Sequence, residues 1–191
     1  MLTITQQFSL LGMKEKSLLG TSSHVKLALV TAGLMDLALN DIITIEKNKV
    51  TVTKDLPDSL SYLAAIYQFI SKKESMKLAR ISETFTFKHK EFKQLKQDVT
   101  NSLVDQDTQK EPLINRIREE VLAQPMSNET AILIVLLHKT KQLKPYFSKS
   151  DISIIKETVK TLKKDESNRL LQAMITNIDA LSVVLVSGAI V

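Results

Sequence analysis

The 191-residue chain contains no cysteine and no tryptophan, and only four glycines and four prolines. The absence of cysteine excludes disulfides, thiolate metal sites and cysteine nucleophiles, and it suits a reducing compartment. The scarcity of glycine and proline favours long helices over many strands and turns. The chain also has no HExxH, GxSxG, GxGxxG or Walker sequence, so the common catalytic and nucleotide-binding motifs are missing. We therefore expect a protein that is not an enzyme and has no cofactor.

Histidine is rare as well. The three histidines are His24, His89 and His138, and no two of them are three or four residues apart. Neighbouring ligands at such spacing are what a helical metal site needs. His138 follows the apolar run 131–137, and we interpret it as a core histidine that is hydrogen-bonded to backbone. The sequence predicts no metal ligand and no catalytic residue.

Long hydrophobic runs are missing too. The longest are the seven residues 131–137 and the twelve residues 180–191, whereas a membrane-spanning helix needs about 20. We interpret both as parts of core helices, the second within a last helix from about residue 166 to 191. The first residues have neither a basic segment nor a long apolar segment, so a cleaved signal peptide is not expected.

Positive charge is in excess, with 26 Lys and Arg against 21 Asp and Glu. The whole excess of five lies between Lys72 and Lys96, a segment with eight basic residues and three glutamates, and the rest of the chain has 18 residues of each sign. A basic segment on an otherwise neutral chain is typical of a solvated lysine-rich face, and also of a surface that contacts phosphate groups. Both interpretations stay open.

The apolar periodicity predicts a mainly α fold. Ser22-Ser23 can cap a helix over 24–39 that is apolar nearly all round and should therefore be buried. Ser127 or Asn128 can cap a second apolar helix, which Pro145 closes. We read the polar stretch 105–111 as a loop, with Pro112 as the first residue of the next helix. Further helices are expected over about 58–70, 74–85, 88–103 and 152–162, with Ser150-Asp151 as the cap of the last of these and Lys156 on its outer face.

A short β-hairpin is predicted between the first two long helices. Ile43, Ile45, Val50 and Val52 share one parity on their two arms, as a half-buried pair of strands requires. A helix followed by a hairpin also occurs in winged DNA-binding domains. The helix over 24–39, however, has only Lys26 as a basic residue, so it favours a core helix braced by the hairpin. The expected architecture is a single globular domain over residues 1–191, a helical bundle around buried central helices with a short β-hairpin.

Three segments carry a family resemblance. LTITQQFSLLGMKEK (2–16) and LVTAGLMDLALNDIITIEKNKVTV (29–52) resemble the amino-terminal signature of the Golgi phosphoprotein 3 family, the GPP34 domain. ETAILIVLLHKTKQLKPYF (129–147) is similar to a later helix of that family. The segments occur in the family's order and span most of the chain, so the chain is identified as a bacterial-type member.

The resemblance implies a function in membrane traffic. Eukaryotic members are peripheral Golgi proteins that bind phosphatidylinositol 4-phosphate and hold the cytoplasmic tails of glycosyltransferases. The family fold is a single, mainly helical domain whose β-hairpin is used in oligomerisation. These properties are what the resemblance implies for this chain, including a lipid-binding adaptor role.

The lipid pocket of the family differs here. In the family it uses a tryptophan and an arginine near the first long helix, and two basic residues of a later helix. The corresponding positions fall near Thr21 and Val30, and the later helix corresponds to Pro112–Leu122, which offers Arg116. Each charge-assisted phosphate contact that is lost removes about 1.5–3 kcal/mol. We therefore expect binding of anionic lipid in general rather than of a specific phosphoinositide.

Together these observations predict a non-catalytic peripheral-membrane adaptor of a bacterial cytoplasm. Anionic membrane lipid and the tails of membrane enzymes are the expected partners, and no nucleic acid is expected. The residues expected to contact lipid or another anion are Lys72, Lys73, Lys77, Arg80, Arg116 and Arg118. Two alternatives remain open: a protein-interaction scaffold that does not bind lipid, and a nucleic-acid-binding protein of winged-helix type.

Overall fold

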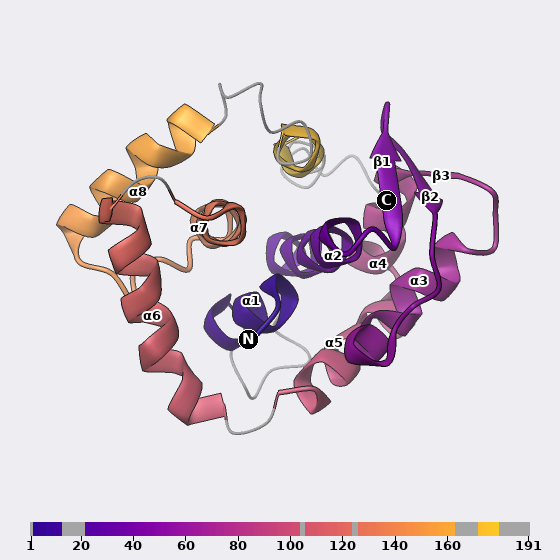
Figure 1. Ribbon diagram of the computed structural model, residues 1–191, viewed down its shortest axis with the longest axis horizontal. Coiled ribbons are helices and arrows are strands. Elements are labelled where there is room, and N and C mark those ends of the chain that lie inside the picture. The colour runs from indigo at the N-terminus through magenta and orange to yellow at the C-terminus, as the bar shows by residue number, and fades with distance from the viewer. Residues whose placement is uncertain (1, 13–21, 104–105, 124–125, 163–171, 180–191) are drawn as a thin grey trace.

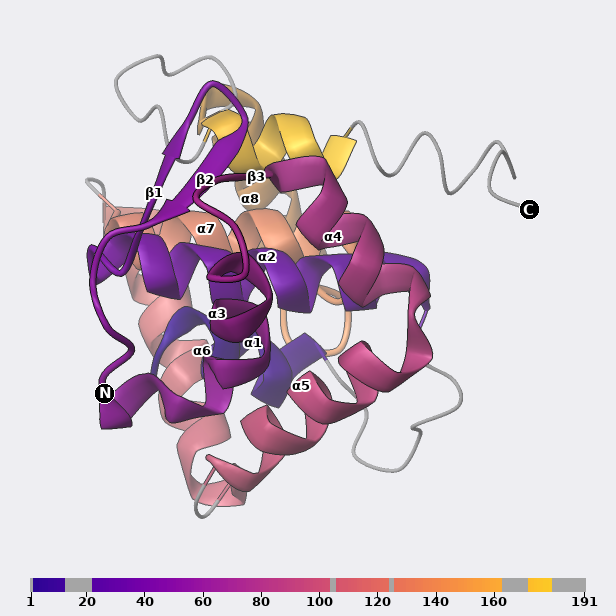
Figure 2. The same ribbon diagram turned by 90° about the vertical axis from the view of Figure 1, so that its right-hand side faces the viewer.

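Two apolar helices lie side by side at the centre of the molecule, α2 (Ser23–Leu39) and α7 (Asn128–Lys139). Figure 1 shows both nearly end-on, and Figure 2 shows both running across the view. Ser22 caps α2 by accepting the Val25 N–H, and Ser127 caps α7 by accepting the Thr130 N–H. The middle of each helix, residues 27–37 and 130–137, is buried on all sides, as the nearly continuous apolar sequences predict. The computed structural model describes residues 2–12, 22–103, 106–123, 126–162 and 172–179.

A buried carboxylate of α2 caps a neighbouring helix. Helix α1 (Ile4–Gly12) packs against both central helices and has no acidic residue in its own first turn. Asp36 accepts the N–H groups of Ile4 and Thr5, each at 2.9 Å. Free N–H groups at a helix start need such acceptors. Asp36 therefore fixes where α1 begins and how α1 sits on α2.

The predicted hairpin is present as β1 (Ile43–Glu46) and β2 (Lys49–Val52). Ile43 pairs with Val52 and Ile45 with Val50, so these four side chains share one face, as the parity predicted. The two turn residues, Lys47 and Asn48, both have positive φ, 47° and 63°. Such a turn matches the twist of the two strands.

A third strand was not predicted. β3 (Met76–Lys77) pairs with β2, where the sequence suggested that a helix had already begun at residue 74. Helix α4 begins only at Leu78 and runs to Phe87. The Leu78 N–H donates to the Asn48 carbonyl at 2.9 Å, which ties the start of α4 to the hairpin turn. A two-residue strand has no periodicity of its own, because it exists only through pairing with β2.

The remaining elements form a shell around the central pair. In Figure 1, α6 and α8 lie on one side, and the sheet, α3 and α5 lie on the other. The shell comprises η1 (Asp58–Leu63), α3 (Ala64–Ile70), α5 (His89–Asn101), α6 (Gln106–Ala123), α8 (Lys149–Leu162) and a helical segment over 172–179. The protein is thus a mainly α bundle around buried central helices with a small antiparallel sheet, as predicted.

Two predicted boundaries of the shell were wrong. Helix α6 begins at Gln106 and contains Pro112, so residues 106–111 are helical rather than a loop. A surface helix can begin with polar turns, because its first residues need no apolar stripe. Helix α8 begins at Lys149, with Ser148 and Asp151 exchanging hydrogen bonds across its first turn. The cap is therefore Ser148 and not Ser150.

The end of α7 was also misplaced. The helix stops at Lys139, well before Pro145, because Lys141 adopts the left-handed conformation with φ 60°. Its N–H donates to the His138 carbonyl, and the next N–H, of Gln142, donates to the Leu137 carbonyl at 2.9 Å. This is a Schellman motif, in which glycine usually occupies the left-handed position.

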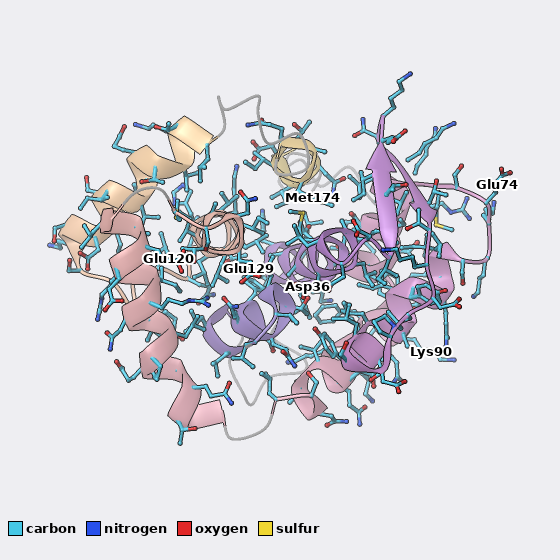
Figure 3. All side chains as sticks on the ribbon, in the orientation of Figure 1. Asp36, Glu74, Lys90, Glu120, Glu129 and Met174 are labelled. Carbon is cyan, nitrogen blue, oxygen red and sulfur yellow. The ribbon has the colours of Figure 1, made fainter. Side chains whose placement is uncertain are left out.

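The last predicted helix is described only in part. Residues 172–179 are helical, and Asn177 Nδ2 donates to Ser82 Oγ of α4 at 3.0 Å. Met174 of this segment points toward the central helices in Figure 3, and it is buried. The predicted remainder of that helix, residues 166–171 and 180–191, lies outside the described residues.

Candidate functional site

The sheet edge gathers exposed cations, including four of the six predicted contact residues. Lys72 and Lys73 lie in the turn before β3, Lys77 lies in β3, and Arg80 lies in the first turn of α4. The sheet adds two lysines that the sequence did not nominate: Lys49 is paired with Lys77, and Lys47 lies in the turn that is tied to α4. The name sheet patch is used below for Lys47, Lys49, Lys72, Lys73, Lys77 and Arg80.

All six side chains of the sheet patch are exposed. Among the described residues none of them has a salt bridge. Glu46 and Glu74 are the acidic residues of the same segments, so positive charge predominates. Figure 3 shows Glu74 at the outer edge of the molecule, far from the central Asp36. Exposed cations without salt bridges along one edge of a sheet are suited to contact with an extended charged surface.

The other two predicted contact residues lie elsewhere and are used internally. Arg116 and Arg118 belong to α6, which also carries Glu120 on the side of Figure 3 opposite to Glu74. Arg116 donates to Gln7 Oε1 of α1 at 2.7 Å, and its Nε lies 3.7 Å from a carboxylate oxygen of Glu120. This arginine joins α6 to α1.

Arg118 is held in a similar way. It donates to the Tyr146 carbonyl at 2.7 Å and lies over the Phe147 ring, 5.8 Å from its centroid. It therefore joins α6 to the segment before α8. The structure does not bring the six predicted residues together into one site.

Near the positions that the GPP34 resemblance assigns to a lipid pocket, the described residues form a modest cavity. Val30 is completely buried, and Thr21 lies outside the described residues. A cavity of about 260 Å³ opens beside Arg116 and is lined by Leu2, Gln7, Thr108, Gln109, Pro112, Leu113 and Arg116. Arg116 is the only charged side chain among the described residues of this lining, and Glu120 partly neutralises it. The cavity is thus poorly suited to a multiply charged headgroup.

A larger cavity lies between α7 and α8, with a volume of about 550 Å³. Its lining consists of His138, Lys139, Lys141, Leu143, Lys144, Ile152 and Lys156. The name α7–α8 cavity is used below for this site. Sequence reasoning missed the cavity. It assigned Lys156 to an outer face, where the side chain is indeed exposed although it also borders the cavity, and it assigned His138 to the core. His138 is in fact half-buried at the cavity wall. The lysine-rich sequence from His138 to Lys144 was the available signal.

The buried titratable groups serve the fold. Asp36 is 3 % exposed, and burial raises its pKa even though hydrogen bonds from Thr5 and Ile4 oppose that change. Burial, and then the neighbouring Asp36, raise the pKa of Tyr62 well above its ordinary value. Tyr62 lies 2.6 Å from Thr3 Oγ1, just before α1. Asp36 and Tyr62 line neither cavity, so their role is to fix the start of α1.

A third titratable group, Glu120, stabilises the start of α7. Partial burial raises the pKa of Glu120, but the hydrogen bonds from Ser127, together with the nearby Thr130 and the charge of Arg116, outweigh it, so the net pKa is lowered. Glu120 accepts both the backbone N–H and the hydroxyl of Ser127, the residue that caps α7. The ionised carboxylate therefore holds α6 against the start of α7.

No three histidine, aspartate or glutamate side chains in the described ranges are grouped so that they could hold a metal ion. None of the described helices is long and apolar enough to cross a membrane. No family model matches the sequence, and no curated protein matches it.

Proposed function

We propose that the protein is a non-catalytic peripheral-membrane adaptor whose sheet patch contacts anionic lipid. The observation that carries the proposal is the gathering of six exposed cations at one edge of the sheet, none of which has a salt bridge in the described part of the chain. A basic residue near an anionic membrane contributes about 1 kcal/mol to binding. Several such residues on one edge can hold a protein at the surface without an inserted helix.

The resemblance to the GPP34 domain supports the same proposal. The hairpin and the helix before it are the segments that carry the resemblance, and the hairpin also supplies Lys47 and Lys49 of the patch. Arg116 and Arg118 are engaged with other protein groups. Contact with lipid is therefore assigned to the sheet patch, without a specific headgroup. The tails of membrane enzymes are the proposed cargo.

Co-sedimentation with vesicles tests the proposal. The triple variant Lys72→Glu/Lys73→Glu/Lys77→Glu is compared with Lys88→Glu/Lys90→Glu/Lys93→Glu, which changes the net charge equally at exposed positions outside the patch. We expect the patch variant to bind phosphatidylglycerol vesicles at least about 100-fold more weakly, since three contacts of about 1 kcal/mol are lost and reversed. The control variant should lose much less, and binding should weaken with added salt.

Three results would contradict the membrane proposal. These are equal pelleting on neutral and anionic vesicles, no pelleting on either, and equal losses in the two variants. Duplex DNA at physiological salt provides a further comparison, because retardation of DNA without vesicle binding would favour the nucleic-acid alternative. A winged-helix mode of binding needs an exposed reading helix, whereas α2, which precedes the hairpin, is enclosed.

The scaffold alternative is favoured by one specific observation. Leu122 of α6 is 64 % exposed and Ile154 of α8 is 39 % exposed, and both border a small hollow between the two helices. Large exposed apolar side chains that lie close together are typical of protein contacts. A chain that pellets with neither kind of vesicle would leave this function as the better explanation.

A further inference from the structure

The α7–α8 cavity combines a suitable size with one sign of charge. Its volume of about 550 Å³ lies within the usual range for small-molecule sites, about 300–1,000 Å³. Among the described residues, four lysines and one histidine line it, and no acidic residue does. Leu143, which is 4 % exposed, and Ile152 supply the apolar part of the lining. Basic groups and a non-polar surface thus face one space.

The fold directs these lysines by a specific turn. The Schellman motif at the end of α7 forces Lys141 into the left-handed conformation and reverses the chain there. Residues 141–144 consequently pass beside the end of α7 and lead toward α8, which contributes Ile152 and Lys156. A lysine at a position that favours glycine carries a conformational cost. The lysine side chain thus supplies a positive charge at this position, which glycine would not.

The charges of the cavity are largely uncompensated. Lys139 forms a salt bridge with Asp179 of the segment 172–179, which holds that wall in place. Lys141, Lys144 and Lys156 have no salt bridge within the described part of the chain. Three ammonium groups around one concave space repel each other, and an anion with several acceptor oxygens would relieve that repulsion.

We propose that the α7–α8 cavity binds a phosphate monoester that carries a small non-polar group. Lys141, Lys144 and Lys156 surround the phosphate, and Leu143 and Ile152 contact the non-polar group. Such a ligand is either a free small molecule or the headgroup region of a lipid, and the two share the same chemistry. The proposal does not depend on the sheet patch, which lies on the other side of the α2–α7 pair from α8.

Titrations with defined probes test the site. Phenyl phosphate, inorganic phosphate and benzyl alcohol are added separately to the full chain, and binding is followed by amide NMR shifts. We expect saturable binding of phenyl phosphate with shifts around 138–144 and 152–156, weaker binding of inorganic phosphate and no saturation with benzyl alcohol. The proposal is overturned if phenyl phosphate does not saturate at millimolar concentration, or if benzyl alcohol binds equally well.

Matched variants locate the binding. Lys144→Gln/Lys156→Gln should weaken phenyl phosphate binding about 100-fold, since each charged contact accounts for roughly a factor of ten or more. Lys149→Gln/Lys160→Gln removes the same charge from exposed positions of α8 outside the cavity and should leave binding unchanged. Equal losses in the two variants would reject the site.

A vesicle experiment separates the two sources of ligand. If pelleting on phosphatidic acid vesicles falls in the cavity variant, the phosphate belongs to lipid. If pelleting persists while phenyl phosphate binding is lost, the ligand is a free small molecule. Both results support the cavity as a phosphate site. The triple sheet-patch variant serves as the reference, because it should retain phenyl phosphate binding even if all vesicle binding is lost.

Discussion

The sheet patch and the α7–α8 cavity both gather lysine side chains, but they differ in shape and surroundings. The patch is an exposed edge of the sheet, and its cations come from strands, turns and the first turn of α4. The cavity is concave, has apolar residues in its lining and lies beside a strained turn. Its shape therefore suits one small anion, whereas the patch suits a wide charged surface. The number of lysines alone would not distinguish the two.

Helix α2 supports both the sheet patch and the α7–α8 cavity. Weakening its packing is therefore the strongest test of whether the two regions bind their ligands independently. Helix α2 packs against α4, which borders the patch, and against α7, which lines the cavity. Asp36 of α2 accepts two buried N–H groups. In Asp36→Asn one of these N–H groups would face an amide donor. An unsatisfied buried group costs about 1–3 kcal/mol, so we expect the free energy of unfolding to fall by about 3 kcal/mol.

Urea unfolding followed by circular dichroism measures this loss. Asp41→Asn is the matched control, because Asp41 is exposed at the end of the same helix, with φ 55°, a conformation that asparagine tolerates. Below the unfolding transition, Asp36→Asn should bind vesicles and phenyl phosphate as the parent does. A loss in only one region would mean that α2 supports the two regions unequally.

The difference in free energy of unfolding between the parent and Asp36→Asn should change with pH in a defined direction. Burial raises the pKa of Asp36 above its ordinary value of 3.8, so the folded protein holds this proton more tightly than the unfolded chain. The stabilising contribution of protonated Asp36 is complete below pH 3.8 and is lost as the pH rises through the folded pKa. The gap in stability between the parent and Asp36→Asn should therefore be widest near the acid end and narrow toward neutral pH. A gap that widens toward neutral pH would contradict this account.

The sequence predicted the central frame well, because the information for it is local. Ser22 and Ser127 stand directly before the helices that they cap, and the parity of Ile43 to Val52 fixed the faces of the hairpin. Strand β3 and the early start of α6 were missed. The first depends on pairing with a distant strand, and the second consists of polar turns that resemble a loop.

The sites were harder to predict than the frame, because their partners are distant in sequence. Arg116 looks like a free surface cation, but it donates to Gln7 across 109 positions of the chain. Lys49 joins the patch only through its register with Lys77. The cavity depends on the left-handed conformation of Lys141, which no residue pattern announces because glycine is absent there. Charge in the sequence therefore indicated candidates but not their surroundings.

A second substitution sharpens the comparison by separating stability from binding in the cavity. Lys141→Gly should relieve the left-handed strain and raise the free energy of unfolding by about 0.5–1 kcal/mol. It should also weaken phenyl phosphate binding about tenfold, because one of the three unpaired lysines is removed. Thermal unfolding and NMR titration measure the two effects.

Asp41→Gly is the control for Lys141→Gly. Asp41 occupies the corresponding left-handed position at the end of α2. Its stability gain should be smaller, since aspartate tolerates this conformation better than lysine does, and phosphate binding should not change. If Lys141→Gly were more stable and bound phenyl phosphate as tightly as the parent, Lys141 would have no role in the cavity.

The smallest effect is expected from one lysine of the sheet patch. Lys77 pairs directly with Lys49, and like charges opposite each other destabilise a sheet by a few tenths of a kcal/mol. Lys77→Gln should therefore stabilise the fold by about 0.3 kcal/mol while weakening binding to anionic vesicles about fivefold. Lys73→Gln removes an equal charge from a turn outside the paired strands, so it should weaken vesicle binding similarly without the gain in stability. If both variants had unchanged vesicle binding, the paired lysines would be only a destabilising feature of the sheet, and the α7–α8 cavity would be the better candidate for contact with phosphate.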